Sequence, residues 1–266
     1  MDLQLGGKRA LVTGGSRGIG RAIARQLALE GASVVIAAQD PDRLGQAVKD
    51  LSAEVDASVE GYAVDTRSDA SVKALVEATV DALGSLDILV NAAAKPGGQG
   101  APPRLAEITE AALWEDVNVK VMGYLRTARE AAPHMAAAGW GRIINISGLA
   151  ARQSGSIIGS IRNVAVAAMT KNLADELGAK GINVTVVHPG ATRTERTAGR
   201  VAEVAAASGV SREDAERRMT AAVSIGRMVD AAEVADIVAF LASPRSVAIN
   251  GDAIACGGGI RGAIHY

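Results

Sequence analysis

Short, largely apolar runs with β-forming residues alternate along the chain with longer segments rich in Ala, Leu, Glu, Lys and Arg. The apolar runs are Arg9–Thr13, Ser33–Ala37, Val59–Val64, Leu86–Asn91, Arg142–Ser147, Asn183–His188 and Ala253–Cys256. Several are almost wholly apolar, which is typical of parallel strands buried on both faces. The segments between them, predicted as helices, are residues 18–30, 41–53, 69–83, 109–138 and 160–179. This alternation predicts an α/β fold with a doubly wound parallel sheet.

No segment has the composition of a domain linker, so residues 1–266 are predicted to form a single domain. Residues 191–222 form a polar, Ala-rich insertion with many Arg and Glu residues. Two interpretations of this insertion stay open. It folds over an active site as a lid, or it is a solvated helical excursion.

Composition excludes several classes of partner. The 28 basic and 29 acidic side chains leave a net charge of −1, so no global basic field attracts nucleic acid or an anionic membrane. Aromatic residues make up only 2%, too few for base-stacking platforms. One cysteine and three scattered histidines predict neither an internal disulfide nor a metal site. Without a signal-peptide pattern or an apolar run of transmembrane length, we expect a cytoplasmic protein.

The first predicted strand leads into a glycine-rich loop, Thr13–Gly20, with the spacing G-x-x-x-G-x-G. Glycines allow a sharp turn and a close approach to a pyrophosphate, which the free N–H groups of the next helix then face. A purely structural turn would not need three glycines at this spacing. The loop therefore predicts a Rossmann-type dinucleotide site. Its predicted cofactor-binding residues are Gly14, Ser16, Arg17, Gly18, Ile19 and Gly20.

This spacing resembles TGxxxGIG, the fingerprint of the short-chain dehydrogenase/reductase family, and the resemblance covers almost the whole chain. Asn118 matches the family's helix asparagine, and Asn91-Ala92-Ala93-Ala94 resembles its NNAG strand end with two departures. Pro189-Gly190 followed by Thr194 is similar to its PGxxxT stretch. The further cofactor-binding residues that the resemblance implies are Gln39, Asp65, Thr66, Asn91, Ala92, Ala93, Asn163, Pro189, Gly190, Thr192 and Thr194.

The resemblance implies an NAD(P)-dependent oxidoreductase that transfers hydride to or from a small carbonyl or alcohol substrate. It also implies a homo-oligomer, a dimer or tetramer formed through the helices near 109–138 and 160–179. The alternative is that the faces of these helices pack in the core of one subunit.

The end of the second predicted strand favours NADP(H), with NAD(H) as the alternative. An NAD site usually has a carboxylate here for the ribose 2′-hydroxyl, but the matching position is Ala38. Asp40, two residues on, is predicted to cap the next helix. Arg17 can pair with a 2′-phosphate, or it is a solvated loop charge. Gln39 stands where NADP-using relatives often have a second Arg.

The family's proton-transfer motif, Y-x-x-x-K, is absent from this sequence. The only tyrosines are Tyr62, Tyr124 and Tyr266, and none is followed by Lys four residues later. When Met169–Ala174 is matched to the family's LTKSLA, the Tyr position falls at Gly159 and the Lys position at Asn163.

The catalytic Ser position falls at Gly148, after Ile143–Ser147, which resembles the family's INIS. Of the four catalytic residues that the resemblance implies, only Asn118 is retained.

Neighbouring residues are candidates for the missing roles. Ser147 and Ser160 adjoin the Ser and Tyr positions, although strand-end and helix-cap hydroxyls explain them as well. Asn163 can still bond the nicotinamide ribose without supplying charge. His188 has a suitable pKa but is also interpreted as a packed residue, and Lys95 as a solvated loop lysine.

Three functions therefore stay open. The first is an oxidoreductase with a non-standard proton donor, which acts on a small-molecule substrate. The second is a catalytically inactive NADP(H)-binding protein, such as a sensor or a subunit of a complex. The third is a non-redox lyase or isomerase on the same fold.

Overall fold

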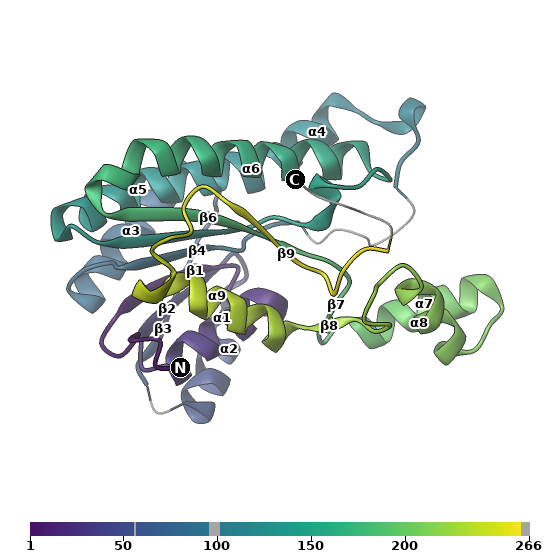
Figure 1. The fold of residues 1–266 in the computed structure, drawn as a ribbon, viewed down its shortest axis with the longest axis horizontal. Helices are drawn as coiled ribbons and strands as arrows, with labels where there is room; N and C mark the ends of the chain where they lie inside the picture. Colours follow the sequence, from purple (N-terminus) through teal and green to yellow (C-terminus); the bar gives the residue numbers. More distant parts are fainter. Residues whose placement is uncertain (56, 96–101, 262–266) are drawn as a thin grey trace.

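A central parallel sheet organises the molecule (Figure 1). The structure is a computed structural model that describes residues 1–55, 57–95 and 102–261. Within these ranges the sheet has seven strands in the order β3-β2-β1-β4-β5-β6-β9, all paired in parallel. Their bounds are β1 Arg9–Thr13, β2 Ser33–Ala38, β3 Val59–Ala63, β4 Ile88–Asn91, β5 Gly141–Ile146, β6 Ile182–Pro189 and β9 Ala253–Cys256. The predicted doubly wound fold is confirmed, and each predicted strand is found within two residues at either end.

Helices cover both faces of the sheet (Figure 1). They are α1 Gly18–Leu29, α2 Pro41–Glu54, α3 Asp69–Leu83, α4 Glu110–Val117, α5 Gly123–Ala138, α6 Ile157–Leu177 and α9 Ala231–Ala242. Helices α1, α2 and α9 form one layer, and α3, α5 and α6 the other. Alternate side chains of a strand point to opposite faces, so Ala10 and Val12 of β1 pack in the first layer and Leu11 in the second.

Helix ends follow local sequence signals. Asp40 accepts a hydrogen bond from the Arg43 N–H at 3.0 Å and Pro41 starts α2, so the predicted cap is confirmed. At α6 the cap is Ser156, whose hydroxyl accepts from the Gly159 N–H at 3.1 Å. The prediction of a cap role for Ser160 is wrong, because α6 starts three residues earlier than expected.

The predicted helix 109–138 is interrupted. A π-helical turn, Asn118–Met122, separates α4 from α5. Such turns rotate the following side chains relative to a regular helix, and they occur frequently at functional sites. Here the turn directs Lys120 inward, where it is 3% exposed.

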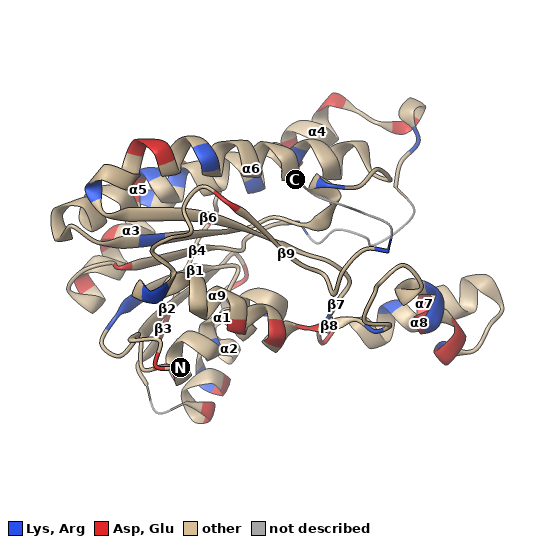
Figure 2. Cartoon of the chain, viewed as in Figure 1, with Lys and Arg blue, Asp and Glu red and all other residues tan. Residues whose placement is uncertain are grey.

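The insertion forms a small helical unit beside the sheet (Figure 1). It contains β7 Thr192–Arg193, α7 Thr197–Ser208 and α8 Arg212–Thr220, and β7 pairs with β8 Val229–Asp230. Val201, Ala205, Ala215 and Met228 form its own apolar cluster. Figure 2 shows basic and acidic residues close together along its helices, while the strands of the central sheet carry few. Whether it closes as a lid stays a prediction.

The sheet order places the functional region. Strands β1 and β4 are neighbours, and the chain winds outward from them in opposite directions. Ligands of such sheets bind at this reversal, outside the carboxyl ends of the strands. Thr13 and Asn91 are paired there. Among the described helices, none is both long and apolar enough to cross a membrane.

Candidate active site

The glycines of the Thr13–Gly20 loop allow a turn that larger residues would block. A Cβ on Gly20 would lie 2.2 Å from the carbonyl oxygen of Gly14, and one on Gly14 would lie 2.7 Å from Ala92. Gly14 and Gly18 also have positive φ values of 69° and 56°. The loop is thus folded tightly against the ends of β1 and β4.

The N-terminus of α1 faces a carboxylate. The side chain of the N-cap residue, Arg17, does not cap this helix, and the first helical residue, Gly18, donates its N–H to Glu195 Oε2 at 3.2 Å. Glu195 belongs to the insertion, 177 residues further along the chain. An anion is favoured here because the helix dipole and the free N–H groups both point to it. The glutamate oxygen therefore marks an anion-binding position at the start of α1.

An open cavity of about 470 Å³ adjoins this position. The residues that line it are Ser16, Arg17, Arg21, Arg43, Glu195 and Arg196. Burial lowers the pKa of Arg17, and the nearby guanidinium groups of Arg43 and Arg196 lower it further. Like charges held this close are stabilised by a bound anion. Sequence reasoning found Arg17 but missed Arg43, which lies on α2 rather than in a recognised motif.

Other predicted cofactor residues surround the same sheet edge but have protein partners. Asp65 is paired with Arg67 at 2.8 Å, which lowers the pKa of the carboxyl group. Thr66 donates its hydroxyl to the Val119 carbonyl at 3.1 Å. Gln39 is exposed at the end of β2.

The predicted nicotinamide side is held by short-range bonds. The Thr192 hydroxyl donates to the Gly190 carbonyl at 3.1 Å, and the Thr194 N–H donates to Thr197 Oγ1 at 2.9 Å. Pro189 ends β6 and is buried. These bonds shape the loop that leads from β6 into the insertion.

Asn91 belongs to a buried network. Its Nδ2 donates to Asn145 Oδ1 at 3.0 Å, and its Oδ1 accepts from the Thr127 hydroxyl at 2.6 Å. Ala92 and Ala93 donate their N–H groups to the Thr13 hydroxyl at 3.2 and 3.4 Å. These polar groups hold the ends of β1, β4 and β5 in register.

The candidate hydroxyls near the expected reaction centre are bonded to the backbone. Ser147 donates to the Asn163 carbonyl at 3.1 Å, and Ser160 donates to the Gln153 carbonyl at 3.1 Å. The side-chain oxygen of Asn118 accepts from Arg126 at 2.9 Å. Tyr124 is buried and donates to the Ile146 carbonyl at 2.9 Å. Tyr62 bonds Glu60, and Tyr266 lies outside the described residues.

Lys120 was not predicted from the sequence as a site residue, yet its side-chain nitrogen reaches the end of β5. Its Nζ donates to the Ser147 carbonyl and to Asn163 Oδ1, both at 2.9 Å. Burial lowers the pKa of Lys120 to about 7, and the Arg162 charge lowers it further, while Asp116 opposes the shift. The signal that could have found it is a lysine two residues after the family's helix asparagine.

The two other candidates from the sequence, Lys95 and His188, lie in contrasting environments. Lys95 is exposed and paired with Glu115. His188 is 1% exposed, and no described residue bonds its Nδ1. Burial lowers the pKa of His188 to about 4, with further contributions from Arg152 and Lys120, so the imidazole is neutral at pH 7.

A family model described as enoyl-(acyl carrier protein) reductase matches residues 14–261. The chain belongs to the short-chain dehydrogenase/reductase family. A putative ketoacyl reductase of Streptomyces coelicolor is 38% identical over 255 residues, 94% of this chain and 95% of that protein. A sorbitol dehydrogenase of Cereibacter sphaeroides is 34% identical over 247 residues, 92% of this chain and 93% of that protein.

Solved structures of short-chain dehydrogenases/reductases share the fold over nearly the full length. The L-sorbose reductase of Gluconobacter frateurii, in complex with NADPH and L-sorbose, superposes with a TM-score of 0.92. It is 30% identical, and the match covers 99% of this chain and 100% of that one. A variant of actinorhodin polyketide ketoreductase with NADPH has a TM-score of 0.86 at 35% identity, covering 94% and 96%.

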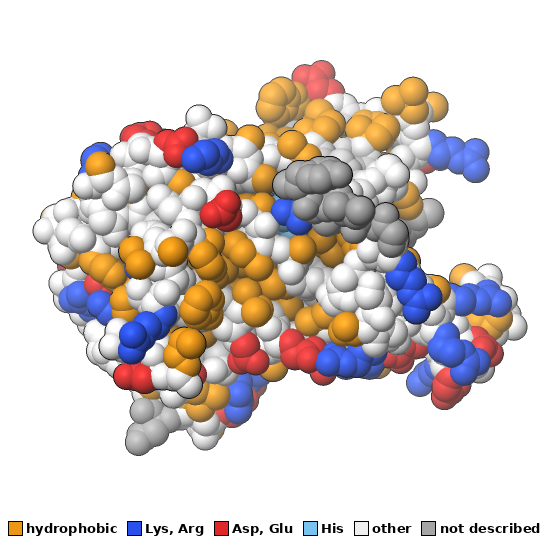
Figure 3. Space-filling model, in the orientation of Figure 1, with side chains coloured by type: hydrophobic (Ala, Val, Ile, Leu, Met, Phe, Trp, Pro, Cys, Tyr) orange, Lys and Arg blue, Asp and Glu red, His pale blue; other side chains and the backbone are white. Residues whose placement is uncertain are grey.

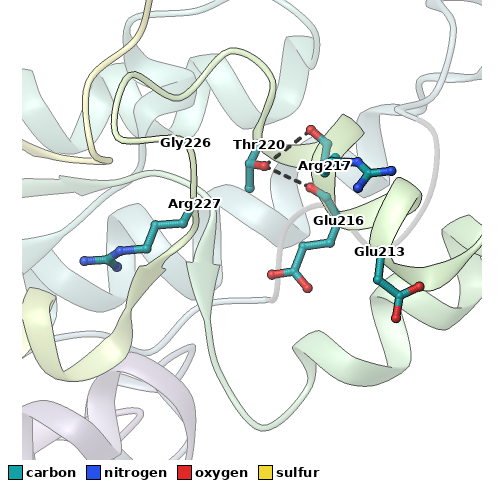
Figure 4. Close-up of a pocket in the computed structure, with 6 residues that line it drawn as sticks. All are labelled: Glu213, Glu216, Arg217, Thr220, Gly226 and Arg227. Atoms are coloured by element: carbon teal, nitrogen blue, oxygen red, sulfur yellow. Dashed lines mark hydrogen bonds between the residues drawn. The ribbon is translucent and has the colours of Figure 1, made fainter.

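A second cavity, of about 260 Å³, lies in the insertion of this family member (Figure 4). Its lining residues are Glu213, Glu216, Arg217, Thr220, Gly226 and Arg227. The Thr220 hydroxyl is directed at the backbone carbonyls of Glu216 and Arg217 (Figure 4). Glu216, Arg217 and Arg227 are ion-paired with Arg193, Asp214 and Glu233. This cavity includes no residue of the phosphate loop, so we do not assign it a role.

Proposed function

We propose that the protein is an NADP(H)-dependent oxidoreductase that acts on a small carbonyl or alcohol substrate. The observation that carries the proposal is the arginine-lined cavity beside the phosphate loop. Its position next to Gly18 and its positive charge suit a 2′-phosphate, which NAD(H) lacks. Two family members of known structure that resemble the chain were solved with NADPH.

The residues present fit this cofactor. The backbone of the Thr13–Gly20 loop and the N-terminus of α1 would hold the pyrophosphate, while Arg17 and Arg43 would hold the 2′-phosphate. Asp65 and Thr66 are proposed for the adenine side, and Gly190, Thr192 and Thr194 for the nicotinamide side. When bound, the cofactor supplies or accepts the hydride. Glu195 would have to leave the Gly18 N–H for the phosphates to occupy that position.

We propose that Gly148, Gly159 and Asn163 occupy the family's Ser, Tyr and Lys positions. Gly159 is buried in the first turn of α6, and Asn163 follows one turn later. The hydroxyls of Tyr62 and Tyr124 are bonded elsewhere. A non-standard group would therefore handle the proton.

The absence of the family's Ser, Tyr and Lys from the proposed positions favours a second candidate, a protein that binds NADP(H) without catalysis. General acid–base catalysis contributes about 10²–10⁴-fold to rate, so its loss would leave a slow or inactive protein.

Cofactor titration and turnover separate these proposals. Tryptophan or cofactor fluorescence should show tighter binding of NADPH than of NADH, and Arg17→Ala or Arg43→Ala should weaken only NADPH, by about 10-fold. Arg25→Ala is the control, because Arg25 pairs with Glu54 on the same helix layer but does not line the cavity. Tighter binding of NADH would contradict the cofactor assignment.

Turnover is tested by NADPH oxidation with ketoses and β-ketoacyl thioesters. NADPH binding without oxidation by any carbonyl compound would favour the non-catalytic candidate.

A further inference from the structure

Lys120 brings a positive charge to the edge of the sheet where the substrate carbonyl is expected. Its side chain is 3% exposed, and its two hydrogen-bond acceptors, the Ser147 carbonyl and Asn163 Oδ1, are both uncharged. The nearby charges of Arg162 and Asp116 form an ion pair with each other. The Lys120 charge is thus not cancelled by a carboxylate of its own. A buried charge of this kind is costly and needs a compensating role or partner.

The lysine fixes which way the Asn163 amide points. An ammonium can only donate, so the amide oxygen must face Lys120 and the NH₂ group must face away from it. The NH₂ group faces Gly148, where Nδ2 would lie 3.1 Å from a Cβ. Among the described residues, none accepts a hydrogen bond from this Nδ2. Asn163 thus presents a donor at the position that matches the family's catalytic serine.

We propose that Lys120 and Asn163 form a relay, in which Lys120 orients and polarises the Asn163 amide so that Nδ2 donates a hydrogen bond to the substrate's carbonyl oxygen. Asn163 is the catalytic residue, and Lys120 is a positioning residue that acts through it. The inference rests on the proposed oxidoreductase function. A fixed donor stabilises the negative charge that develops on the oxygen as hydride from NADPH reaches the carbonyl carbon, and a proton from solvent then converts the alkoxide to the alcohol. Bonding Oδ1 to an ammonium strengthens the opposite N–H of the same amide.

Gly148 is consistent with this role. Because residue 148 is glycine, no side chain stands next to Nδ2 on this side. A serine here would bring its Cβ within 3.1 Å of Nδ2 and compete for the amide. In the proposed relay, Gly148 therefore leaves room next to the amide, and Asn163 supplies the hydrogen-bond donor.

The relay makes the reaction pH-dependent. The charged groups that face Lys120 are Asp116 on α4 and Arg162 on α6, and the neutral His188 faces it from β6. The pKa of Lys120 is lowered to about 7, so the ammonium is lost as pH rises through neutrality. Polarisation of Asn163 should weaken over the same range, and kcat for carbonyl reduction should fall with it.

The coupling can be measured without turnover. In ¹H–¹⁵N spectra of the full chain, the Asn163 side-chain amide, assigned by its loss in Asn163→Leu, should shift with an apparent pKa near 7. Lys120→Met removes the ammonium at similar length, and the titration should disappear. Persistence of the same titration in Lys120→Met would overturn the relay. If that variant does not fold, titration of the Lys120 Nζ resonance in wild type and its displacement in Asn163→Leu give the same test.

Activity provides the second readout. Lys120→Met should lower kcat about 10–100-fold, with the NADPH dissociation constant unchanged. Asn163→Leu should lower kcat similarly, and the double variant should be no worse than either, because the residues act as one unit. Lys171→Met is the matched control, because it removes an exposed lysine of α6 that is paired with Asp175. It should change neither kcat nor the NADPH dissociation constant. Additive losses, or an unchanged kcat in Lys120→Met, would refute the relay.

Failure of the broader proposal looks different. If the wild-type protein fails to oxidise NADPH with every carbonyl compound tested, the oxidoreductase function and the substrate-donor role of Asn163 are both refuted. This holds even if the amide titration shows that Lys120 and Asn163 are coupled.

Discussion

At the phosphate loop, backbone N–H groups and arginine side chains surround an open cavity. Where β5 ends and α6 begins, in contrast, most polar groups are already bonded to the protein. Burial and the charges of Arg43 and Arg196 lower the pKa of Arg17, and the carboxylates of Asp40 and Glu195 oppose this effect. By contrast, the hydroxyls of Ser147 and Tyr124 are bonded to backbone carbonyls. The first region is arranged to receive charge from a ligand. The second supplies its own charge through Lys120, and in the proposed relay its donor is the Asn163 amide.

The largest effect should come from disrupting the turn of the phosphate loop. Gly20→Val would place a Cβ 2.2 Å from the Gly14 carbonyl oxygen, which forces the loop away from the helix start. We expect NADPH affinity to fall by at least about 100-fold, since both the turn and the anion-facing N–H groups are displaced. Isothermal titration calorimetry checks this.

Gly45→Ala is the control for Gly20→Val, because a Cβ there meets nothing within 4 Å. It should bind normally and be slightly more stable. Normal NADPH binding by a folded Gly20→Val variant would show that the cofactor does not use this loop.

A second test concerns the buried ammonium group of Lys120. Its pKa is about 7 in the folded state, below its usual value of 10.5, so the unfolded chain binds more protons between these values. The free energy of unfolding should therefore rise with pH from 7 towards 10, by about a few kcal/mol from this group. Urea denaturation across this range should show the rise in wild type and a smaller one in Lys120→Met.

The difference between the two urea profiles isolates Lys120 from the other groups that titrate. Identical pH profiles for the two proteins would mean that the ammonium is not desolvated, and the contrast between the two regions would lose its basis.

The phosphate loop and the sheet could be predicted because their signals are local. Glycine spacing, strand apolarity and the Asp40 cap each depend on a few adjacent residues, and the structure reproduces them. The contribution of Arg43 could not be predicted, because it depends on how α2 is placed beside the loop. Lys120 was missed for a similar reason. A regular helix over 109–138 gives no reason to bury it, and only the π-helical turn at Asn118–Met122 directs it to Asn163.

A third test introduces lysine at residue 163, which we proposed as the family's Lys position. Asn163→Lys would place a second ammonium beside Lys120, and two like charges a few ångströms apart near a protein surface repel strongly. We expect a loss of about 2 kcal/mol in the free energy of unfolding at pH 6, where Lys120 is charged. The double variant Asn163→Lys, Lys120→Met should recover most of this loss. Chemical denaturation of both variants checks it, and equal stability of the single and double variants would argue against a charged Lys120.

The smallest effect on folding concerns an apolar surface on α4 and α6. Ile157, Ile161 and Val164 of α6 are 49%, 45% and 50% exposed and lie at helical spacing, next to Trp114 of α4 at 59%. Figure 3 shows hydrophobic atoms gathered over α4 and the start of α6. We propose that this surface joins copies of the chain into the homo-oligomer that the family resemblance implies. α6 also carries Asn163, so an interface there would hold the relay rigid.

Ile161→Glu tests this interface, because a charge in an apolar contact opposes association. Light scattering at micromolar concentration should show a larger species for wild type and a smaller one for the variant. The stability of the monomer should change by less than about 0.5 kcal/mol, as is usual for exposed positions. Leu29→Glu on α1, 49% exposed in the opposite helical layer, should leave the assembly intact. A monomeric wild-type protein, or an unchanged assembly in Ile161→Glu, would remove the interface, and the relay would then depend on the packing of α6 within one chain.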